Sequence, residues 1–409
     1  MARAAPVGRP ATAGSSEAIR SPRARTGGAR SVRLLNVRVA AAIVRVTARG
    51  QFSRYGGPAV STTDRFESEL ATMAGVDHAL AVNSGTSALI CALVGAGIGP
   101  GDEVLVPAYT WISSAAAPIA VGAVPVLVDI DESLTIDPVA LDAACGERTK
   151  AVIAVHMNNL VCDMDAITAV AAERDLRVVE DACQAVGVTY RGRRVGTIGD
   201  VGAFSFNQHK NVTSGEGGAV LTDDPVIAAR AAMYHDVGSY IRPREVVGEV
   251  PVFIGQNARM PELSSAMLRP QIARIDEQLR RRAHRRRILV EAMESSTSFE
   301  GTLVEHRSPD DAVALAVRFD DPATAERFAR KRGVTRLIDS GRHVFTNWQP
   351  IQERRTHHPN VDPWAGHDVD YSADRYRATL ETLERSCTIG VPPQVPATAF
   401  RALALDLFR

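Results

Sequence analysis

Seven short apolar runs between residues 79 and 223 constrain the fold of this chain more than any other feature. Several are uninterrupted and rich in valine, isoleucine and alanine, which is typical of strands buried on both faces of a largely parallel sheet. We therefore predict an α/β fold in which helices flank a mostly parallel, seven-stranded sheet. The predicted strands are residues 79–82, 103–106, 124–131, 151–156, 177–182, 202–206 and 218–223.

Apolar residues at helical spacing predict helices within 33–49, over 65–76, from near Thr86 and around 163–174. After residue 260 the sequence pattern changes from apolar strand-like runs to polar, helical segments. One long polar helix over 264–293 is followed by a strand, a helix and a second strand, which indicate a smaller α+β domain. These last elements are predicted at residues 312–319, 323–334 and 336–340. The predicted division is a disordered basic tail (1–32), a large domain (33–260) and a small C-terminal domain (261–409).

The N-terminal segment departs from the balanced charge of the chain. Residues 1–50 contain ten arginines and one acid, Glu17. A transit-like peptide and a basic arm for nucleic acid are the functional alternatives. We interpret the segment as a disordered tail, because it has no apolar core with a cleavage site and the basic bias stops where the globular pattern begins. Residues 279–287, also rich in arginine, are interpreted as a charged helix face.

The overall composition narrows the class of protein. The 409 residues carry a formal net charge of zero, so we expect no nucleic-acid partner. Five scattered cysteines without a Cys-x-x-Cys pair are typical of reduced thiols in a cytoplasmic protein. No apolar run approaches the roughly 18 residues that span a membrane. His357 and His358 lack an acid or cysteine at ligand spacing, so we expect no metal site.

Lys210 lies in the stretch “FSFNQHKNVTSGEGG”, in a chain that almost always uses arginine. Of 47 basic residues 44 are arginine, and the only lysines are Lys150, Lys210 and Lys331. A lysine held in a site can lose its proton and attack a carbonyl group, which arginine cannot do. Lys150 precedes a strand at the opposite end, and Lys331 lies in a charged helix end. The pattern therefore indicates a chemical role for Lys210.

Two further motifs follow predicted strands. “NSGTS” (83–87) places small residues at a helix start, where backbone N–H groups and hydroxyls bind phosphate; ordinary helix capping is the alternative reading. “VVEDACQAVG” places Asp181 at the carboxyl end of a strand, where α/β proteins build their sites. For Asp181 a helix N-cap is equally compatible, with Gln184 completing a capping box.

A phosphate cradle, an acid and a lysine are the parts that a pyridoxal 5'-phosphate (PLP) site needs. PLP chemistry uses a lysine that forms a Schiff base and an acid that pairs with the pyridinium nitrogen. The three motifs together therefore predict a PLP enzyme.

The sequence resembles the DegT/StrS-like aminotransferases of keto-sugars and ketocyclitols, PLP enzymes with the aspartate-aminotransferase-like fold (fold type I). The resemblance runs from about Leu34 to the C-terminus. It rests on “GGP”, “FESELATMAGVDHALAVNSGTSAL”, “GPGDEVLVPAYTW”, “CDMDAI”, “VVEDACQAVG”, “GDVGAFSFNQHKN”, “SGEGG” and “GQNARMPELSSA”.

The resemblance implies a role for each matching residue. Lys210 would be the Schiff-base lysine and proton shuttle, and Asp181 would pair with the pyridinium nitrogen. Gln184 would lie near the phenolic oxygen of the cofactor, and Trp111 would stack on the pyridine ring. The phosphate would be held by Gly85, Thr86 and Ser205, and by Asn257 of the neighbouring subunit, which implies a homodimer with a shared site.

Three motifs depart from the family pattern, and the resemblance places them near the acceptor. They are “MNNLVCDM” after His156, “YHDVG” near residue 236 and “NQH” before Lys210. Residues 344–350 are a further candidate to face the acceptor, although Trp348 fits a buried position equally well.

The function that the resemblance implies is transfer of an amino group from glutamine or glutamate to a keto-sugar or ketocyclitol, as in amino-sugar or aminocyclitol biosynthesis. Two alternatives stay open. One is a PLP-dependent sugar dehydratase on the same scaffold; the other is a regulator or binding module without catalysis.

Overall fold

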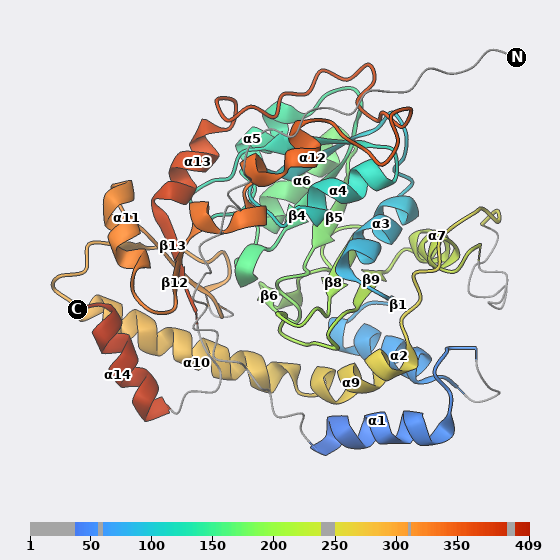
Figure 1. The fold of residues 1–409 in the computed structure, drawn as a ribbon, viewed down its shortest axis with the longest axis horizontal. Coiled ribbons are helices and arrows are strands. Elements are labelled where there is room, and N and C mark those ends of the chain that lie inside the picture. Colours follow the sequence, from blue (N-terminus) through green and yellow to red (C-terminus); the bar gives the residue numbers. More distant parts are fainter. Residues whose placement is uncertain (1–36, 56–59, 239–249, 310–311, 391–396) are drawn as a thin grey trace, which may run out of the picture.

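The computed structural model describes residues 37–55, 60–238, 250–309, 312–390 and 397–409. The predicted tail (1–32) and the “GGP” motif lie outside these residues. The chain folds around one large sheet and one small sheet, connected by a long helix, α10, that runs along one side of the molecule (Figure 1).

The large sheet has the strand order β1-β9-β8-β5-β4-β2-β3. Strand β9 runs antiparallel to both neighbours, and the other pairs are parallel. The prediction of a mostly parallel, seven-stranded sheet is confirmed. Its strands are β1 (His78–Val82), β2 (Glu103–Pro107), β3 (Val124–Val128), β4 (Thr149–Val155), β5 (Arg177–Asp181), β8 (Val201–Ser205) and β9 (Gly218–Thr222).

Both faces of this sheet are buried, as the apolar runs predict. Within β4, Val152 and Ala154 face one apolar core, whereas Ile153 and Val155 face the other. This alternation follows the two-residue period of a strand. One core includes side chains of α3, α4 and α7, and the other includes side chains of α2, α6 and α9.

Four helices of this part lie close to the predicted positions: α1 (Val37–Arg49), α2 (Thr62–Ala74), α3 (Gly85–Gly95) and α6 (Met164–Arg174). Three more were not predicted: α4 (Ser113–Ala120), α5 (Pro138–Ala144) and α7 (Pro225–His235). A two-stranded ribbon, β6 (Thr189–Tyr190) and β7 (Arg193–Arg194), lies between β5 and β8 in the sequence.

The C-terminal part is built on a small antiparallel sheet of order β10-β11-β13-β12. Its strands are β10 (Thr302–Leu303), β11 (Leu315–Arg318), β12 (Val334–Arg336) and β13 (Ser386–Ile389). Its helices are α9 (Glu262–Ile272), α10 (Ile275–Glu294), α11 (Pro322–Ala329), α12 (Gln349–Gln352), α13 (Arg377–Glu384) and α14 (Ala397–Leu407), of which α14 lies beside α10 (Figure 1).

Two details of the C-terminal prediction are wrong. The predicted long helix over 264–293 is two helices, because the backbone leaves the helical region at Arg274, with φ −126° and ψ 13°. The predicted strand over 336–340 is instead mostly a 3-10 turn, Leu337–Asp339. Strand β12 ends at Arg336, and a side-chain bond from the Ser340 hydroxyl to the Leu337 carbonyl closes the turn at 2.5 Å.

Part of the C-terminal chain packs onto the large sheet rather than onto the small one. Phe345, Trp348 and Tyr376 belong to the same apolar core as Val104 of β2. The Tyr371 hydroxyl donates to the Pro125 carbonyl in β3 at 2.6 Å. The described residues contain no helix long and apolar enough to cross a membrane. The division of the chain at residue 260 stays a prediction.

Candidate active site

A cavity of about 780 Å³ opens at the carboxyl ends of the parallel strands. Both parts of the chain contribute to its wall, so the site lies between the large sheet and the small one. Seven of the eight residues that the sequence singles out line this cavity. They are Gly85, Thr86, Trp111, Asp181, Gln184, Ser205 and Lys210.

The start of α3 forms one end of the cavity. Ser84 caps the helix, and its hydroxyl accepts from the Ser87 N–H at 3.0 Å. The Thr86 hydroxyl lies 2.8 Å from the Ser113 hydroxyl. A methyl group on Gly85 would come within 2.7 Å of the Ser205 Cβ, so only glycine lets this helix approach β8. N–H groups at a helix start together with these hydroxyls form a cradle for an anion.

Asp181 ends β5 with its side chain almost fully buried. One carboxylate oxygen accepts from the Ser114 hydroxyl at 2.7 Å, and the other accepts from the Cys183 N–H at 3.1 Å. The Thr110 hydroxyl lies 2.7 Å from that of Ser114 and supports it. These bonds fix the carboxylate while each oxygen keeps a second acceptor position for a group in the cavity.

Lys210 follows β8 in a loop that closes back on itself. Its N–H donates to the Asn207 carbonyl at 2.9 Å, and the Asn207 amide donates to the Glu216 carboxylate at 2.9 Å. Gly215 adopts a φ of 89°, which favours glycine. The other two lysines bond elsewhere: Lys331 donates to the Leu407 carbonyl at 2.7 Å, and Lys150 to the Glu147 carbonyl at 3.4 Å. Lys210 is therefore the lysine of this cavity.

Trp111 leaves 41% of its surface exposed in the cavity, and its ring centroid lies 5.2 Å from that of His343. His343, which no sequence motif indicated, reaches the cavity from the C-terminal part of the chain. The adjacent residues 344–350 were the ones predicted to face the acceptor. Of these, Trp348 is fully buried and donates from its indole N–H to the Arg342 carbonyl at 2.8 Å, so it belongs to the core.

Gln184 bonds to a turn made of two asparagines. Its carbonyl oxygen accepts from the Asn158 N–H at 3.1 Å. Asn158 and Asn159 have φ values of 53° and 66°, a region that asparagine tolerates better than most residues. The Asn158 amide donates to the hydroxyl of the buried Tyr109 at 3.3 Å. The “MNNLVCDM” motif thus places two amide side chains at the cavity wall.

Glu180 holds the end of β5 from the opposite face. This fully buried carboxylate accepts from the N–H groups of Gly196 and Gly199, each at 2.7 Å. His156 donates from Nε2 to Glu180 at 2.9 Å, because its Nδ1 accepts from the Cys162 N–H. Burial alone would raise the pKa of Glu180, but these hydrogen bonds outweigh burial and lower it. The sequence contained a signal for this position of Glu180. Neighbouring residues on a strand face opposite sides, so if Asp181 faces the cavity, the adjacent Glu180 must face away from it.

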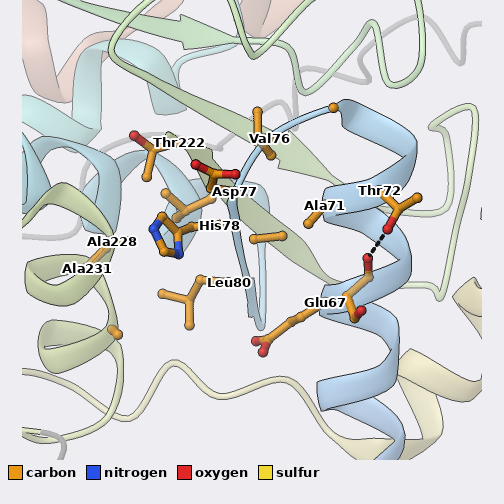
Figure 2. A pocket seen from close by; sticks show the side chains of 15 residues that line it. Glu67, Ala71, Thr72, Val76, Asp77, His78, Leu80, Thr222, Ala228 and Ala231 are labelled. Atoms are coloured by element: carbon orange, nitrogen blue, oxygen red, sulfur yellow. Dashed lines mark hydrogen bonds between the residues drawn. The ribbon is translucent and has the colours of Figure 1, made fainter. Parts of the chain in front are cut away.

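A second cavity, of about 530 Å³, lies beside the first residues of β1, between α2 and α7 (Figure 2). Figure 2 shows His78 and Asp77 on its wall, with the small side chains of Ala228 and Ala231 opposite α2. Glu67 on this wall is already engaged, because it accepts from the Ala81 N–H at 2.8 Å and pairs with Arg54. None of the residues that the sequence singles out lines this second cavity.

Comparison with known proteins assigns the chain to a family. The model of the DegT/DnrJ/EryC1/StrS aminotransferase family matches residues 36–347. The chain belongs to this family. The resemblance drawn from the motifs is therefore confirmed, and the protein is a PLP-dependent aminotransferase with the aspartate-aminotransferase-like fold.

Two curated relatives are similar over most of the chain. The 3-amino-5-hydroxybenzoate synthase of Amycolatopsis mediterranei is 37% identical over 312 residues, which cover 76% of this chain and 78% of that protein. The L-glutamine:2-deoxy-scyllo-inosose aminotransferase of Micromonospora echinospora is 35% identical over 314 residues, covering 72% of each. The crystal structure of 3-amino-5-hydroxybenzoic acid synthase superposes with a TM-score of 0.72 at 29% identity, covering 90% of this chain and 95% of that one.

The residues of the cavity fit PLP. The family's cofactor carries a phosphate, which matches the cradle at the start of α3, where the absence of a Cβ on Gly85 lets the helix approach Ser205. It carries a pyridine nitrogen, which matches the buried acceptor oxygens of Asp181. It also carries an aldehyde that an amine can attack, and Lys210 lies in the same cavity.

Asn257 is the one residue of the expected set that lies away from the cavity. It is exposed and pairs in a short antiparallel bridge with Asp236, within the “YHDVG” motif. The neighbouring Ala258 carbonyl accepts from the Asn83 N–H at 2.8 Å, which ties this segment to the start of the phosphate cradle. A reach from Asn257 into the cavity of a second subunit stays a prediction.

Proposed function

We propose that this aminotransferase moves an amino group from L-glutamine or L-glutamate to a polyhydroxylated ring ketone, either a ketocyclitol or a keto-sugar. The observation that carries the proposal is the common cavity of Lys210, Asp181 and the α3 cradle. The relatives named for amination of 2-deoxy-scyllo-inosose and for 3-amino-5-hydroxybenzoate synthesis support a ring-shaped acceptor.

In this proposal each residue has a defined task. Bound PLP supplies an electron sink for the negative charge that develops when the substrate loses a proton. Asp181 would keep the proton on the pyridine nitrogen, and Gly85, Thr86 and Ser205 would hold the phosphate. Lys210 would bind the cofactor aldehyde between turnovers and would carry the proton that leaves the substrate Cα.

Two further side chains orient the ring. Trp111 presents an exposed indole face in the cavity, which suits stacking on the pyridine ring. Gln184, whose amide is oriented by its bond to the Asn158 N–H, suits a hydrogen bond to the phenolic oxygen. Together these contacts would hold the cofactor from its face and from two of its edges.

The site is proposed to be completed by a second copy of the chain. Exposed apolar side chains lie close to Asn257 in the chain, Val252 and Ile254, the last with 87% of its surface exposed, and Val237 follows its bridge partner Asp236. Apolar side chains at such exposure mark an interaction surface. Asn257 of the second subunit would then reach the phosphate, so that each site draws on both subunits. All five cysteines are unpaired thiols, which supports a cytoplasmic location.

Isotope transfer tests the proposal directly. The enzyme, saturated with PLP, is incubated with amino-¹⁵N-labelled glutamine or glutamate and a pentahydroxycyclohexanone or a nucleotide-linked keto-sugar. A product that gains ¹⁵N in the wild type, and none with Lys210→Ala, is expected. A product that loses water without gaining nitrogen would favour the dehydratase alternative, and an unchanged rate in Lys210→Ala would contradict the proposal.

A further inference from the structure

His343 enters the cavity on a short segment that is fixed to the large sheet. Its carbonyl accepts from the Thr110 N–H at 3.0 Å, and the Phe345 N–H donates to the Ala108 carbonyl at 3.2 Å. Tyr109 and Val344 form an antiparallel bridge between these two bonds. The segment that carries His343 is therefore joined to the loop that continues into Trp111, and its position in the site is set by the backbone.

The hydrogen bonding of the imidazole fixes which nitrogen can accept. Nδ1 lies 2.9 Å from the Ser340 carbonyl oxygen, which can only accept, so Nδ1 carries the proton. In the neutral ring Nε2 is then an acceptor on the opposite edge from Ser340. Because the ring lines the cavity and Nδ1 is engaged within its own segment, Nε2 is the atom available to a bound molecule.

The surroundings keep this ring neutral. Burial is the largest effect and lowers the pKa of His343; the hydrogen bond to the Ser340 carbonyl raises it by less, and the positive charge of Lys210 lowers it further. A neutral imidazole with an acceptor nitrogen pairs with a hydroxyl group. The hydroxyls of a polyhydroxylated ketone are such donors, whereas the carboxylate of an amino donor is itself only an acceptor.

We propose that His343 determines acceptor specificity by accepting, at Nε2, a hydrogen bond from the hydroxyl on the carbon next to the reacting carbonyl. This inference rests on the proposed transfer of an amino group to a ring ketone. It goes further by naming His343 as the residue that distinguishes ketones by the hydroxyl groups they carry. His343 and Lys210 line the same cavity, and the carbonyl carbon must come within reach of Lys210, so we assign to the imidazole the hydroxyl on the adjacent carbon.

Two variants and two ketones test this assignment. His343→Phe keeps a flat ring beside Trp111 and removes the acceptor, whereas His343→Gln keeps an acceptor oxygen. The ketones are a pentahydroxycyclohexanone and the analogue that lacks both hydroxyls beside the carbonyl. Each is assayed for kcat/KM with a saturating amino donor. The donor step is followed alone through the absorbance change of the bound cofactor.

The wild type should prefer the hydroxylated ketone by about tenfold, the value of one hydrogen bond that is lost with its partner left unsatisfied. His343→Phe should remove this preference, and His343→Gln should restore part of it. The donor step should stay within about twofold in both variants. His357→Phe, in an exposed loop, is the matched control and should behave as the wild type.

Three outcomes would overturn the inference. The first is a His343→Phe enzyme that still prefers the hydroxylated ketone. The second is an equal loss in the donor step, which would mean that the ring only supports Trp111. The third is a wild type whose cofactor absorbance responds to a donor but which aminates neither ketone. No response to any donor would instead refute the proposed function itself, which separates the two failures.

Discussion

At the scale of single residues, the proposed chemistry depends on Lys210 and Asp181, which line the same cavity. Arginine accounts for 44 of the 47 basic residues of the chain, yet the basic residue after β8 in this cavity is a lysine. Arginine could not take its place as a nucleophile, because it does not lose its proton at neutral pH. Asp181 is held by Ser114 and by the Cys183 N–H, so its charge is fixed in position before any cofactor enters. Each of these contacts can be tested by a single substitution.

Asp181→Asn keeps the shape of the side chain and removes its charge. The pyridine nitrogen then loses the anion that holds its proton, so the rate of the donor step should fall by about 100-fold or more. PLP should still bind, since the phosphate cradle is intact. Stopped-flow absorbance with L-glutamate measures the rate. Asp142→Asn, on the exposed helix α5, is the control, and a rate in Asp181→Asn equal to that of the control would refute the assigned role.

Gly85→Ala tests the cradle. The added methyl group would lie 2.7 Å from the Ser205 Cβ, so α3 and β8 must move apart and the phosphate contacts weaken. The Kd for PLP, measured by equilibrium dialysis, should rise about tenfold or more. Gly99→Ala is the matched control, because a methyl group there meets nothing closer than 4.0 Å. Equal affinities in the two variants would show that Gly85 has no part in phosphate binding.

At the scale of elements, the end of β5 is held from both faces. Asp181 faces the cavity, and Glu180 faces the opposite core, where it binds the N–H groups of Gly196 and Gly199 and the His156 ring. This arrangement places Asp181 on a strand whose end is fixed to a neighbouring loop. Side chains beyond the first layer thereby set the geometry of the site.

The lowered pKa of Glu180 predicts an acid-sensitive stability. Because its folded-state pKa lies below the ordinary value of 4.5, the unfolded state binds more protons between the two values. The contribution of the Glu180 carboxylate to the free energy of unfolding is therefore complete above about pH 4.5, and it is lost as the pH falls through the folded-state pKa. Urea unfolding at pH 7 should show Glu180→Gln less stable than the wild type by about 3 kcal/mol, with the difference shrinking in acid. A difference that is constant with pH would contradict this prediction.

At the scale of the whole molecule, the sequence predicted the parts that local patterns encode. The seven strands follow from apolar runs. Residues 83–87, Asp181 and Lys210 follow from motifs after strands, because parallel strands bring their carboxyl ends to one edge, whereas Trp111 and Ser205 were implied only by the family resemblance. His343 and Arg282 were not predicted as site residues, although both line the cavity. They come from segments that meet the large sheet only in the folded chain. The same limit explains why the strand predicted over 336–340 is wrong. Its two apolar residues do not extend the small sheet: Leu337 is buried in the core of the large sheet, and Ile338 packs against that core.

A shared site predicts that two inactive variants restore each other. Lys210→Ala removes the lysine, and Asn257→Asp places a negative charge where the partner's phosphate would lie. In mixed dimers one of the two sites has both native residues, so co-refolded equal mixtures should recover about a quarter of the wild-type activity. Each variant alone is the control. Mixtures with no more activity than the separate variants would show that Asn257 serves no neighbouring site.

The visible absorption spectrum of the purified protein with PLP, before and after adding L-glutamine or L-glutamate, tests the central claim most directly. A band from cofactor bound to Lys210, which fades with one of the two donors and is missing in Lys210→Ala, is the predicted result. A wild-type spectrum identical to that of Lys210→Ala, unchanged by either donor, would show that the cavity around Lys210 and Asp181 is not an aminotransferase site.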